Sequence, residues 1–384
     1  MKNSISTNLF ILTIICVSVL FSDQSYSYPR FSAYTGDRCV DCHISPTGGS
    51  MRNQYGINYA KNNLQLKVLE KFSMNAKFNP EINKSISVGG DIRIANINVP
   101  APTIPNTTLS SFLTMQGDLY VNAKINDYVN VFIAPGIYLP TLETKPEVYG
   151  MISKLPLDIY FKAGRFTPNY GIRIPEHRAY QRIDFLNTPY SADAGFELGM
   201  TPGILTFNIG LFNGVNTDFF DNDKKKMFVA NADVMLSGKD NKINVDIGSS
   251  VYNNPYDYRD PGTGVMLNAV THAISGFTKI GLFDHVAILG EVDFKENSIS
   301  GVMTRGLYGF GELDIKILKG FELRGQYEQR NLNRDIDGQK TVRYSMGGAI
   351  FPIIGVEFEA MYRLVHDDIL SFTTEYQGML HFYF

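Results

Sequence analysis

The sequence predicts an all-β protein, a transmembrane antiparallel β-barrel of about 16 strands, preceded by a small N-terminal segment. From residue 85 to residue 384, stretches of about ten residues with alternating apolar and polar side chains recur between turns rich in Gly, Asn, Asp and Pro. The chain also ends on such a stretch, with Phe384 as its last residue. Abundant Tyr, Phe and Gly without Trp fit an aromatic-rich β protein.

The alternating stretches separate an apolar face from a charged one. In the clearest example, one face carries apolar residues or glycine and the other carries charged or amide residues: Phe321, Leu323, Gly325 and Tyr327 against Glu322, Arg324, Gln326 and Glu328. The stretches Leu157–Gly164 and Val356–Leu364 alternate in the same way. A large periplasmic sandwich would alternate too, with its charges outward. The polar faces carry both signs of charge at close spacing, as a wet lumen tolerates, so we expect them to point inward.

Long breaks between the stretches predict extracellular loops, because periplasmic turns in such barrels are short. Four breaks qualify: Pro100–Ser110, Phe166–Ala192, Asn213–Lys225 and Asn253–Leu267. The final strand, which ends in Phe384, resembles the sorting signal read by the insertion machinery of the bacterial outer membrane. These features predict a Gram-negative outer-membrane location, with the barrel wall in contact with lipid.

Residues 1–27 have the pattern of a secretory signal peptide. Lys2 supplies a positive start, Leu9–Phe21 is mostly apolar, and small residues follow at Ser25-Tyr26-Ser27. The apolar run is too short to span a bilayer. We therefore expect export of a mature chain that begins near Tyr28.

The most specific motif is Cys39-Val40-Asp41-Cys42-His43. Two thiols two residues apart, followed directly by an imidazole, form the pattern for covalent attachment of a c-type haem. Each thiol would form a thioether with a vinyl group of the porphyrin, and His43 would be the proximal ligand of the iron. The sequence therefore predicts one covalent haem c, held by Cys39, Cys42 and His43.

Other uses of a Cys pair lack the residues that they need. A zinc site requires two more Cys or His ligands, and a thioredoxin-like redox pair requires a βαβ setting. The only other cysteine is Cys16, within the segment expected to be removed. A disulfide and a zinc site remain the alternatives to haem.

Residues 28–71 are expected to form the haem-binding unit. Pro46–Gly49 is a turn cluster, and Asn53–Leu69 has apolar residues at loose helical spacing. So short a segment cannot bury much core alone. We expect the haem to form a large part of that core and the unit to lean on the barrel, residues 85–384.

Bulk composition excludes some functions. The formal net charge of -3 offers no basic excess for a phosphate backbone, so no nucleic acid partner is expected. No catalytic triad, phosphate loop or zinc hydrolase pattern is present in the sequence, and carboxylates along the strands fit a lumen wall better than acid–base pairs.

The N-terminal residues resemble the start of fused outer-membrane monohaem cytochrome–porins, a family that includes iron-oxidising outer-membrane cytochromes. The likeness is carried by Pro29-Arg30-Phe31, Thr35-Gly36 and Cys39-x-x-Cys42-His43. A second, weaker likeness, to porin-like proteins of metal-reducing bacteria, lies in Gly164-Arg165-Phe166-x-Pro168-x-Tyr170-Gly171-x-Arg173. In architecture the first resemblance covers the whole mature chain, although the chain is short for an iron oxidase.

The resemblance implies electron transfer across the outer membrane, between a periplasmic c-type cytochrome and an extracellular metal ion or mineral, with ferrous iron the leading candidate. Direct oxidation of iron at the haem would make the protein formally an oxidoreductase. The alternatives are a plain channel whose N-terminal segment is a plug or anchor, and a barrel scaffold around separate cytochromes. The scaffold would need an open lumen.

The distal haem ligand has two candidates. Met51 follows His43 by eight residues, and His177 lies in the long break Phe166–Ala192, from which it reaches the haem only if that loop folds into the lumen. We expect a further set of basic residues to form salt bridges in the lumen or to pair with the haem propionates: Arg165, Arg173 and Arg178. The remaining histidines of the barrel are expected to be polar residues of the lumen rather than haem ligands: His272, His285, His366 and His381, the last placed there by alternation.

Overall fold

The computed structural model describes residues 29–73, 79–100, 107–136, 146–185, 191–214, 221, 223–238, 240, 242–368 and 372–384. The predicted signal peptide, residues 1–27, lies outside this range. Among the described residues, no helix is long and apolar enough to cross a membrane.

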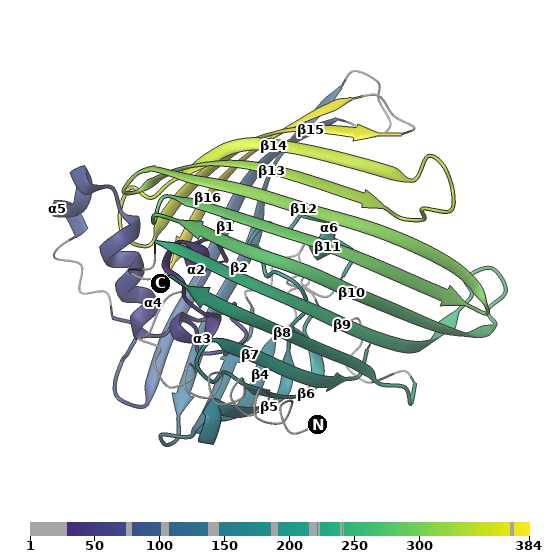
Figure 1. Cartoon of the computed structure of the whole chain (residues 1–384), viewed down its shortest axis with the longest axis horizontal. Helices are drawn as coiled ribbons and strands as arrows, with labels where there is room; N and C mark the ends of the chain where they lie inside the picture. Colours follow the sequence, from purple (N-terminus) through teal and green to yellow (C-terminus); the bar gives the residue numbers. More distant parts are fainter. Residues whose placement is uncertain are drawn as a thin grey trace, which may run out of the picture.

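Sixteen antiparallel strands form a closed barrel, as the sequence predicts (Figure 1). Each strand pairs with its neighbours along the chain, and β1 pairs with β16 to close the sheet. The strands are β1 Ile86–Pro100, β2 Thr108–Lys124, β3 Val129–Ala134, β4 Glu147–Leu155, β5 Ile159–Phe166, β6 Asp193–Met200, β7 Leu205–Phe212, β8 Met227–Ser237, β9 Ile243–Arg259, β10 Met266–Leu282, β11 Val286–Ile299, β12 Val302–Leu318, β13 Phe321–Asn331, β14 Lys340–Ile350, β15 Val356–Asp367 and β16 Thr373–Tyr383. Closure removes the sheet edges that lipid cannot solvate.

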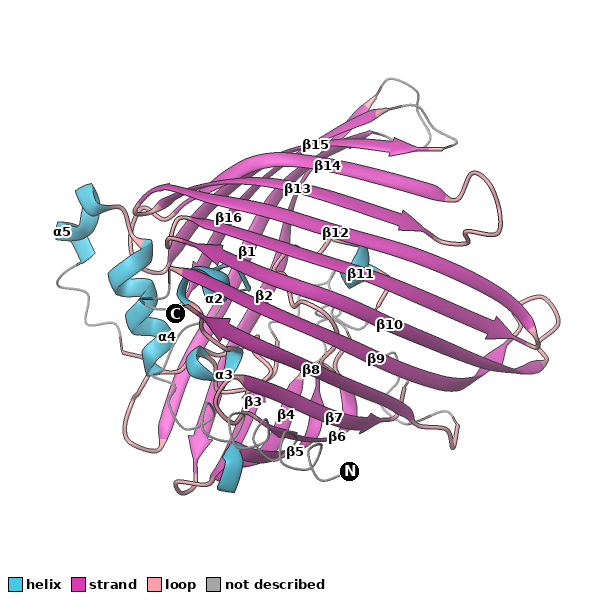
Figure 2. Cartoon of the chain, in the orientation of Figure 1, coloured by secondary structure: helices cyan, strands magenta, loops and turns pink. Residues whose placement is uncertain are grey.

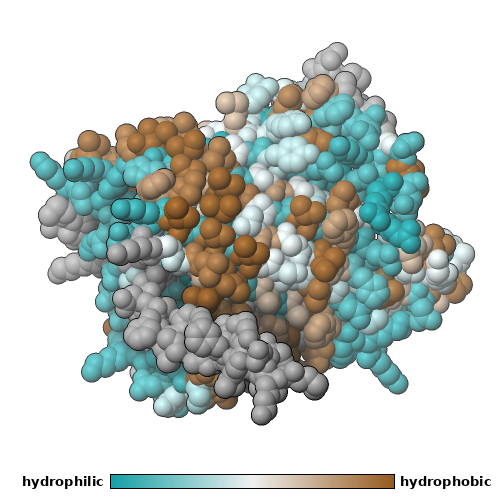
Figure 3. Space-filling view, in the orientation of Figure 1, coloured by the Kyte–Doolittle hydropathy of each residue, from teal (hydrophilic) through white to brown (hydrophobic). Residues whose placement is uncertain are grey.

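The charged faces point inward. On β13 the side chain of Leu323 is 43% exposed on the outer wall, whereas the preceding residue, Glu322, faces the lumen and is only 2% exposed. The same alternation holds on β15 and β16, where Phe358 and Phe382 lie outside and Arg363 and His381 are buried. Figure 3 shows apolar side chains gathered over the barrel wall, with hydrophilic ones toward the ends. The wall is therefore built for lipid outside and polar contacts inside.

The two ends of the barrel differ. At one end most strands are joined by short turns, for example 156–158, 283–285 and 319–320, and the chain terminates there at Phe384. At the other end lies the longest connection, 167–192 (Figure 2). By the rule for outer-membrane barrels the first end is periplasmic and the second extracellular.

Two boundaries predicted from the sequence are wrong. The stretch Asn253–Leu267 is not a loop, because β9 and β10 continue in register until Arg259 pairs with Met266. The strand expected from Leu157 starts at Ile159, because Leu157 and Asp158 have φ values of 63° and 50° in a tight turn.

The other predicted loops lie between strands. The break 213–225 separates β7 from β8, although residues 215–220 and 222 lie outside the described range. Thr108–Ser110, expected at the end of a loop, already belong to β2, and residues 101–106 lie outside the described range. The predicted break 166–192 is indeed a long connection between β5 and β6, and its described residues 167–185 fold inward.

The N-terminal segment enters the periplasmic opening of the barrel (Figure 1). Its elements are α2 Pro29–Thr35, α3 Cys39–Cys42, α4 Gln54–Tyr59, the π-helix η1 Ala60–Leu64, the 3₁₀ helix η2 Lys67–Leu69 and α5 Glu70–Ser73. We call residues 29–71 the plug. The predicted helix Asn53–Leu69 thus forms as three short helices, α4, η1 and η2. Asn53 caps α4, because its side chain accepts hydrogen bonds from the backbone N–H groups of Tyr55 and Gly56.

An arginine on the outer wall tests the predicted lipid contact. Val292, on the outer face of β11, is 48% exposed, so Val292→Arg should lower the free energy of unfolding in lipid by roughly 2–4 kcal/mol. The control is Ile336→Arg in the β13–β14 loop, where the side chain is 55% exposed and the change should be within about 0.5 kcal/mol. Equal effects in denaturant titrations in lipid vesicles would contradict the assignment of this face to the bilayer.

Candidate functional site

The plug is fixed to the inner wall of the barrel through α2. Arg30 is buried between Glu322 of β13 and Glu357 of β15, with nitrogen–oxygen distances of 3.1 and 3.3 Å. The Asn244 side-chain amide donates hydrogen bonds of 3.1 Å to the carbonyls of Ala33 and Tyr34. Charged and backbone groups of α2 therefore find partners in the lumen, as burial requires.

The turn after α2 depends on a glycine. Gly36 has φ of +80°, and a Cβ at this position would lie 2.2 Å from Ser237 Oγ and 2.6 Å from the Asn244 side chain. Both the backbone conformation and the close approach to the wall therefore exclude a side chain.

The Cys39–His43 motif forms the short helix α3 and the extended residue after it. The backbone N–H of Arg38 donates to the Asp41 carboxylate at 3.1 Å, which caps the helix. Cys42 is buried against Gly56 of α4. His43 has extended dihedrals and pairs with Arg52 in an isolated antiparallel bridge.

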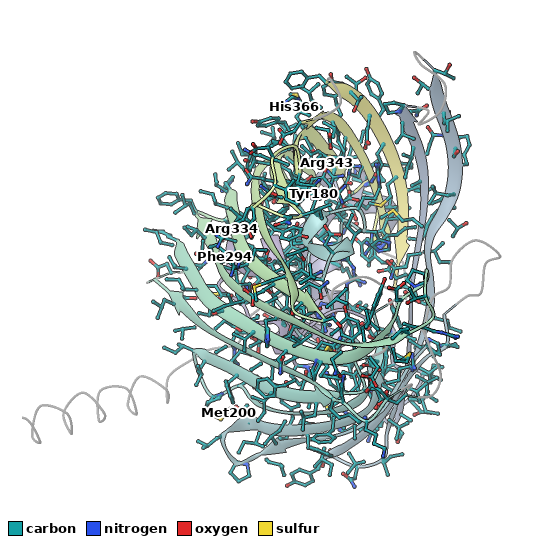
Figure 4. The ribbon with its side chains drawn as sticks, turned by 90° about the vertical axis from the view of Figure 1, so that its right-hand side faces the viewer. Tyr180, Met200, Phe294, Arg334, Arg343 and His366 are labelled. Carbon is teal, nitrogen blue, oxygen red and sulfur yellow. The ribbon has the colours of Figure 1, made fainter. Side chains whose placement is uncertain are left out.

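Residues 167–185 of the connection between β5 and β6 fold into the lumen. These residues contact strands around the wall: Tyr170 donates to Asp293 of β11 at 3.1 Å, and Arg178 pairs with Glu375 of β16 at 2.6 Å. Figure 4 shows Tyr180, in the short helix α6 Tyr180–Ile183, beside Arg343 of β14, whose guanidinium lies 4.6 Å from the Tyr180 ring centre. We call residues 167–185 the inward loop.

The plug and the inward loop meet through Arg173. One guanidinium nitrogen donates to the Gly48 carbonyl of the plug at 2.9 Å, and another donates to the Thr167 carbonyl at 2.6 Å. Glu147 of β4 adds a second bridge, since its carboxylate accepts from Ser50 at 2.7 Å and from Thr167 at 2.8 Å. The two segments are thereby held in a fixed relation inside the barrel.

A cavity of about 180 Å³ lies where they meet, and both His43 and His177 line it. The charged residues around it are Arg52, Arg93, Arg173, Arg182, Asp91, Asp118 and Glu147. The structure therefore brings the predicted proximal histidine and one predicted distal candidate to the same space, because the inward loop carries His177 into the lumen.

His177 is held by the wall of the barrel. A ring nitrogen lies 3.1 Å from the Gln116 side-chain oxygen of β2. Burial, together with the nearby guanidiniums of Arg182 and Arg93, holds the pKa of His177 well below its usual value. The imidazole is therefore neutral at physiological pH, the form in which histidine binds a metal.

Met51 occupies a different environment. It is 1% exposed within an apolar cluster that includes Tyr120, Phe132 and Tyr149, and it does not line the cavity of His43. Its backbone carbonyl accepts from the Ile44 amide at 3.1 Å, which ties it to the chain beside His43.

The other predicted basic residues and histidines divide between wall and lumen. Arg173 lines the cavity, whereas Arg178 pairs with Glu375 and Arg165 donates to the Ala192 carbonyl at 3.0 Å. His381 points into the lumen, as predicted. The expectation that His272 and His285 lie in the lumen is wrong. His272 is exposed between buried Thr271 and Ala273, so it faces outward, and His285 is exposed in the turn between β10 and β11. His366 stacks on Phe372 with ring centres 4.4 Å apart.

A chain of buried polar contacts connects the plug to the inward loop across the β1–β16 seam. Glu357, which holds Arg30, lies 2.8 Å from His381, and His381 lies 3.0 Å from Asp91 of β1. Asp91 in turn pairs with Arg93 at 3.1 Å, and Arg93 donates to the Pro175 carbonyl of the inward loop at 2.9 Å. Two of these residues, Asp91 and Arg93, also line the cavity.

The side chains around the cavity are of the types that bind a haem, but the cavity itself is small. Two histidines could serve the iron, and buried guanidiniums suit propionate carboxylates. The cavity of about 180 Å³ is smaller than the roughly 300–1,000 Å³ of ordinary ligand pockets. Smaller cavities of about 50 and 20 Å³ adjoin α3 at Cys39 and Cys42. Binding of a porphyrin would thus require the segments around α3 to move apart.

Sequence reasoning missed several residues of this site. Arg52, Arg93 and Arg182 were not candidates, although Arg93 lies on the inward face of a predicted strand and alternation could have identified it. Among the described residues, no group of three or more His, Cys, Asp and Glu side chains is arranged to hold a metal ion.

The barrel is similar to solved outer-membrane porins. OprB of Pseudomonas putida matches 78% of this chain and 94% of its own with a TM-score of 0.58 and 8% identity. The anion-selective porin from Comamonas acidovorans matches 78% and 99%, with a TM-score of 0.57 and 11% identity. A loop-deletion mutant of OmpT from Vibrio cholerae matches 78% and 99%, with a TM-score of 0.55 and 10% identity.

No protein-family model and no curated protein matches the sequence. At such low identity the solved structures establish the fold alone. This protein has the 16-stranded barrel of a bacterial outer-membrane porin, with an N-terminal plug.

Replacement of Gly36 tests how the plug is seated. Gly36→Ala should force the plug away from Ser237 and Asn244, and hydrogen exchange of residues 29–71 should become about tenfold faster or more. Gly301→Ala is the matched control, because Gly301 has nearly the same φ, +84°, with nothing within 4 Å of its Cβ position. If both variants leave exchange in the plug unchanged, the contact of Gly36 with the wall does not hold it.

Proposed function

We propose that this protein carries electrons across the outer membrane through a c-type haem, attached to the plug inside a porin-type barrel. The electrons would pass between a periplasmic c-type cytochrome and an extracellular metal ion or mineral, such as ferrous iron. The observation that carries the proposal is that the Cys-x-x-Cys-His motif lies inside the lumen, with His43 facing the same cavity as His177.

A haem bound at this site would supply one-electron chemistry, and the chain's own residues would set its surroundings. Cys39 and Cys42 would hold it by thioethers, and His43 would be the proximal ligand. The neutral imidazole of His177 is the better distal candidate, because Met51 lies outside the cavity. Arg52, Arg93, Arg173 and Arg182 could pair with its propionates.

The contacts between plug, inward loop and wall support the same proposal. The barrel wall shields buried charges from lipid, and the plug would bring a redox group within the thickness of an insulating membrane. Burial and axial ligation are the means by which a protein sets a haem potential.

A second candidate is an anion channel in which the plug has only a structural or gating role. The similarity to porins favours it, and one of the similar proteins is described as anion-selective. The guanidiniums around the cavity would then line the path of the anion. A plug firmly tied to the wall at Arg30 and Gly36 argues against free conduction.

Absorbance spectra test the leading proposal. The detergent-extracted protein should give sharp c-type bands on reduction, at about one haem per chain, and the bands should persist in the denatured protein because attachment is covalent. The variant Cys39→Ser/Cys42→Ser should lose the haem and keep the heat-modifiable migration of a folded barrel. A folded wild-type barrel without haem would contradict the proposal, and single-channel conductance would then test the anion channel.

The distal ligand can be tested separately on the haem-loaded protein. We expect His177→Ala to change the oxidised haem from low spin to high spin in absorbance and electron paramagnetic resonance spectra, and added imidazole to restore the low-spin state. Met51→Leu keeps the volume of the side chain and should leave the spectra unchanged. The opposite pattern would assign the distal position to Met51.

A further inference from the structure

The periplasmic end of the plug carries a small basic surface. Lys67 and Lys71 are exposed, Lys61 is half-buried, and Val68 between them is 79% exposed. We call these four residues the basic cap. Figure 1 shows α5, which carries Lys71, projecting from the end of the barrel at which the chain terminates.

The basic cap is anchored to the rim of the barrel. The backbone N–H of Leu66 donates to the Phe351 carbonyl at 2.8 Å, and Gly320, with φ of +86°, leaves room for Leu66 in the β12–β13 turn. Glu70 pairs with Lys319 of the same turn at 3.4 Å. The one acidic residue within the segment is thus engaged by a barrel lysine, which leaves the cap with its positive charge.

This charge contrasts with that of its surroundings. The whole chain has a formal net charge of -3. At the barrel rim, lysines of two periplasmic turns have acidic neighbours, with Lys124 2.9 Å from Asp127 and Lys242 3.8 Å from Asp240. Among the described residues, no carboxylate lies within 4.0 Å of the amine of Lys61, Lys67 or Lys71. A local basic excess on an acidic protein is a feature that steers a partner of opposite charge.

The basic cap follows in the chain from α4, the helix that packs on the Cys39–His43 motif. Gly56 of α4 packs on Cys42, with its Cβ position 2.6 Å from the Cys42 carbonyl and 3.1 Å from the Cys42 Cβ. The chain runs from α4 directly into η1 and then to η2 and α5. Cys42 is thus covered by α4, in which Asn58 is exposed, and Asn62 of η1 is exposed as well.

From these observations we infer that the basic cap is the docking surface for an acidic periplasmic redox protein. The inference rests on the proposed electron-transfer function, which it deepens by naming the charge of the partner and the place where it binds. The lysines steer the partner by long-range attraction, and Val68 provides a small apolar contact at the centre. So small a surface suits a weak, rapidly exchanging complex, as electron carriers require.

The test measures binding of two soluble haem proteins, the acidic soluble domain of cytochrome b5 and a basic cytochrome c. The haem-loaded protein is placed in nanodiscs of neutral phosphatidylcholine, and association is followed at low salt. Lys67→Glu/Lys71→Glu should slow association with the acidic probe about tenfold or more. The difference should shrink at about 1 M salt, where the Debye length falls to roughly 3 Å.

Two control variants give the comparison its specificity. Lys242→Glu changes an exposed lysine at the same end of the barrel, and Lys224→Glu changes an exposed lysine in the β7–β8 loop at the other end. Both should alter association with the acidic probe less than twofold. Equal losses in all variants, or tighter binding of the basic probe by the wild type, would overturn the inference.

The haem content of each preparation is measured independently, so the two proposals fail in different ways. If haem is present and Lys67→Glu/Lys71→Glu associates with the acidic probe as fast as the wild type does, the docking surface is overturned. The electron-transfer proposal is then unaffected. With haem absent, the proposed function fails and this inference fails with it, whatever the probes do. If phosphatidylglycerol in the nanodisc abolishes probe binding by the wild type, the basic cap binds inner-leaflet lipid and the inference is overturned.

Discussion

The arrangement inside the barrel depends on one buried ionic contact, that of Arg30 with Glu322 and Glu357. This guanidinium fixes the plug to two strands, and through Glu357, His381, Asp91 and Arg93 it is coupled to the inward loop across the seam where the barrel closes. Buried charges add stability only when each of them has a partner. Removing one partner leaves the other charge buried and unpaired, which costs roughly 3–5 kcal/mol. The plug, the seam and the loop therefore form one polar network, and the cavity lies beside it.

Alternation of side chains predicted the strands and their two faces, but it could not say which face is inside. That assignment needed the number of strands, the two signs of charge on the polar faces and the final strand ending in Phe384. Alternation failed at residues 253–267, where β9 and β10 extend beyond the apolar band and carry turn-forming residues such as Asn253, Asn254 and Pro255. The motif Cys39–His43 was visible as a short pattern. That His177 shares its cavity could not be read from the sequence, since the contact depends on Arg173, Arg178 and Tyr170 folding the loop inward over long separations.

The porin fold and the plug answer different physical requirements. The wall solves the problem of crossing lipid without unpaired backbone groups, and it does so with a fold that unrelated sequences at about 10% identity share. The plug brings two cysteines, one histidine and a basic surface that such a wall does not need. Function in this protein is therefore to be sought where the plug meets the wall, and the two proposals differ in whether that junction serves to carry electrons or to restrict the passage of ions.

The plug precedes the barrel in the chain but ends up enclosed by it, and this has a consequence for biogenesis. Once β1 pairs with β16, Cys42 is buried behind α4 and the lumen wall, out of reach of an enzyme that would attach a prosthetic group. If a haem is attached to Cys39 and Cys42, as we propose, its attachment would therefore have to be completed in the periplasm, on a chain that has not yet inserted. The closing of the last seam would then act as a checkpoint, because it seals whatever the N-terminal segment carries at that moment.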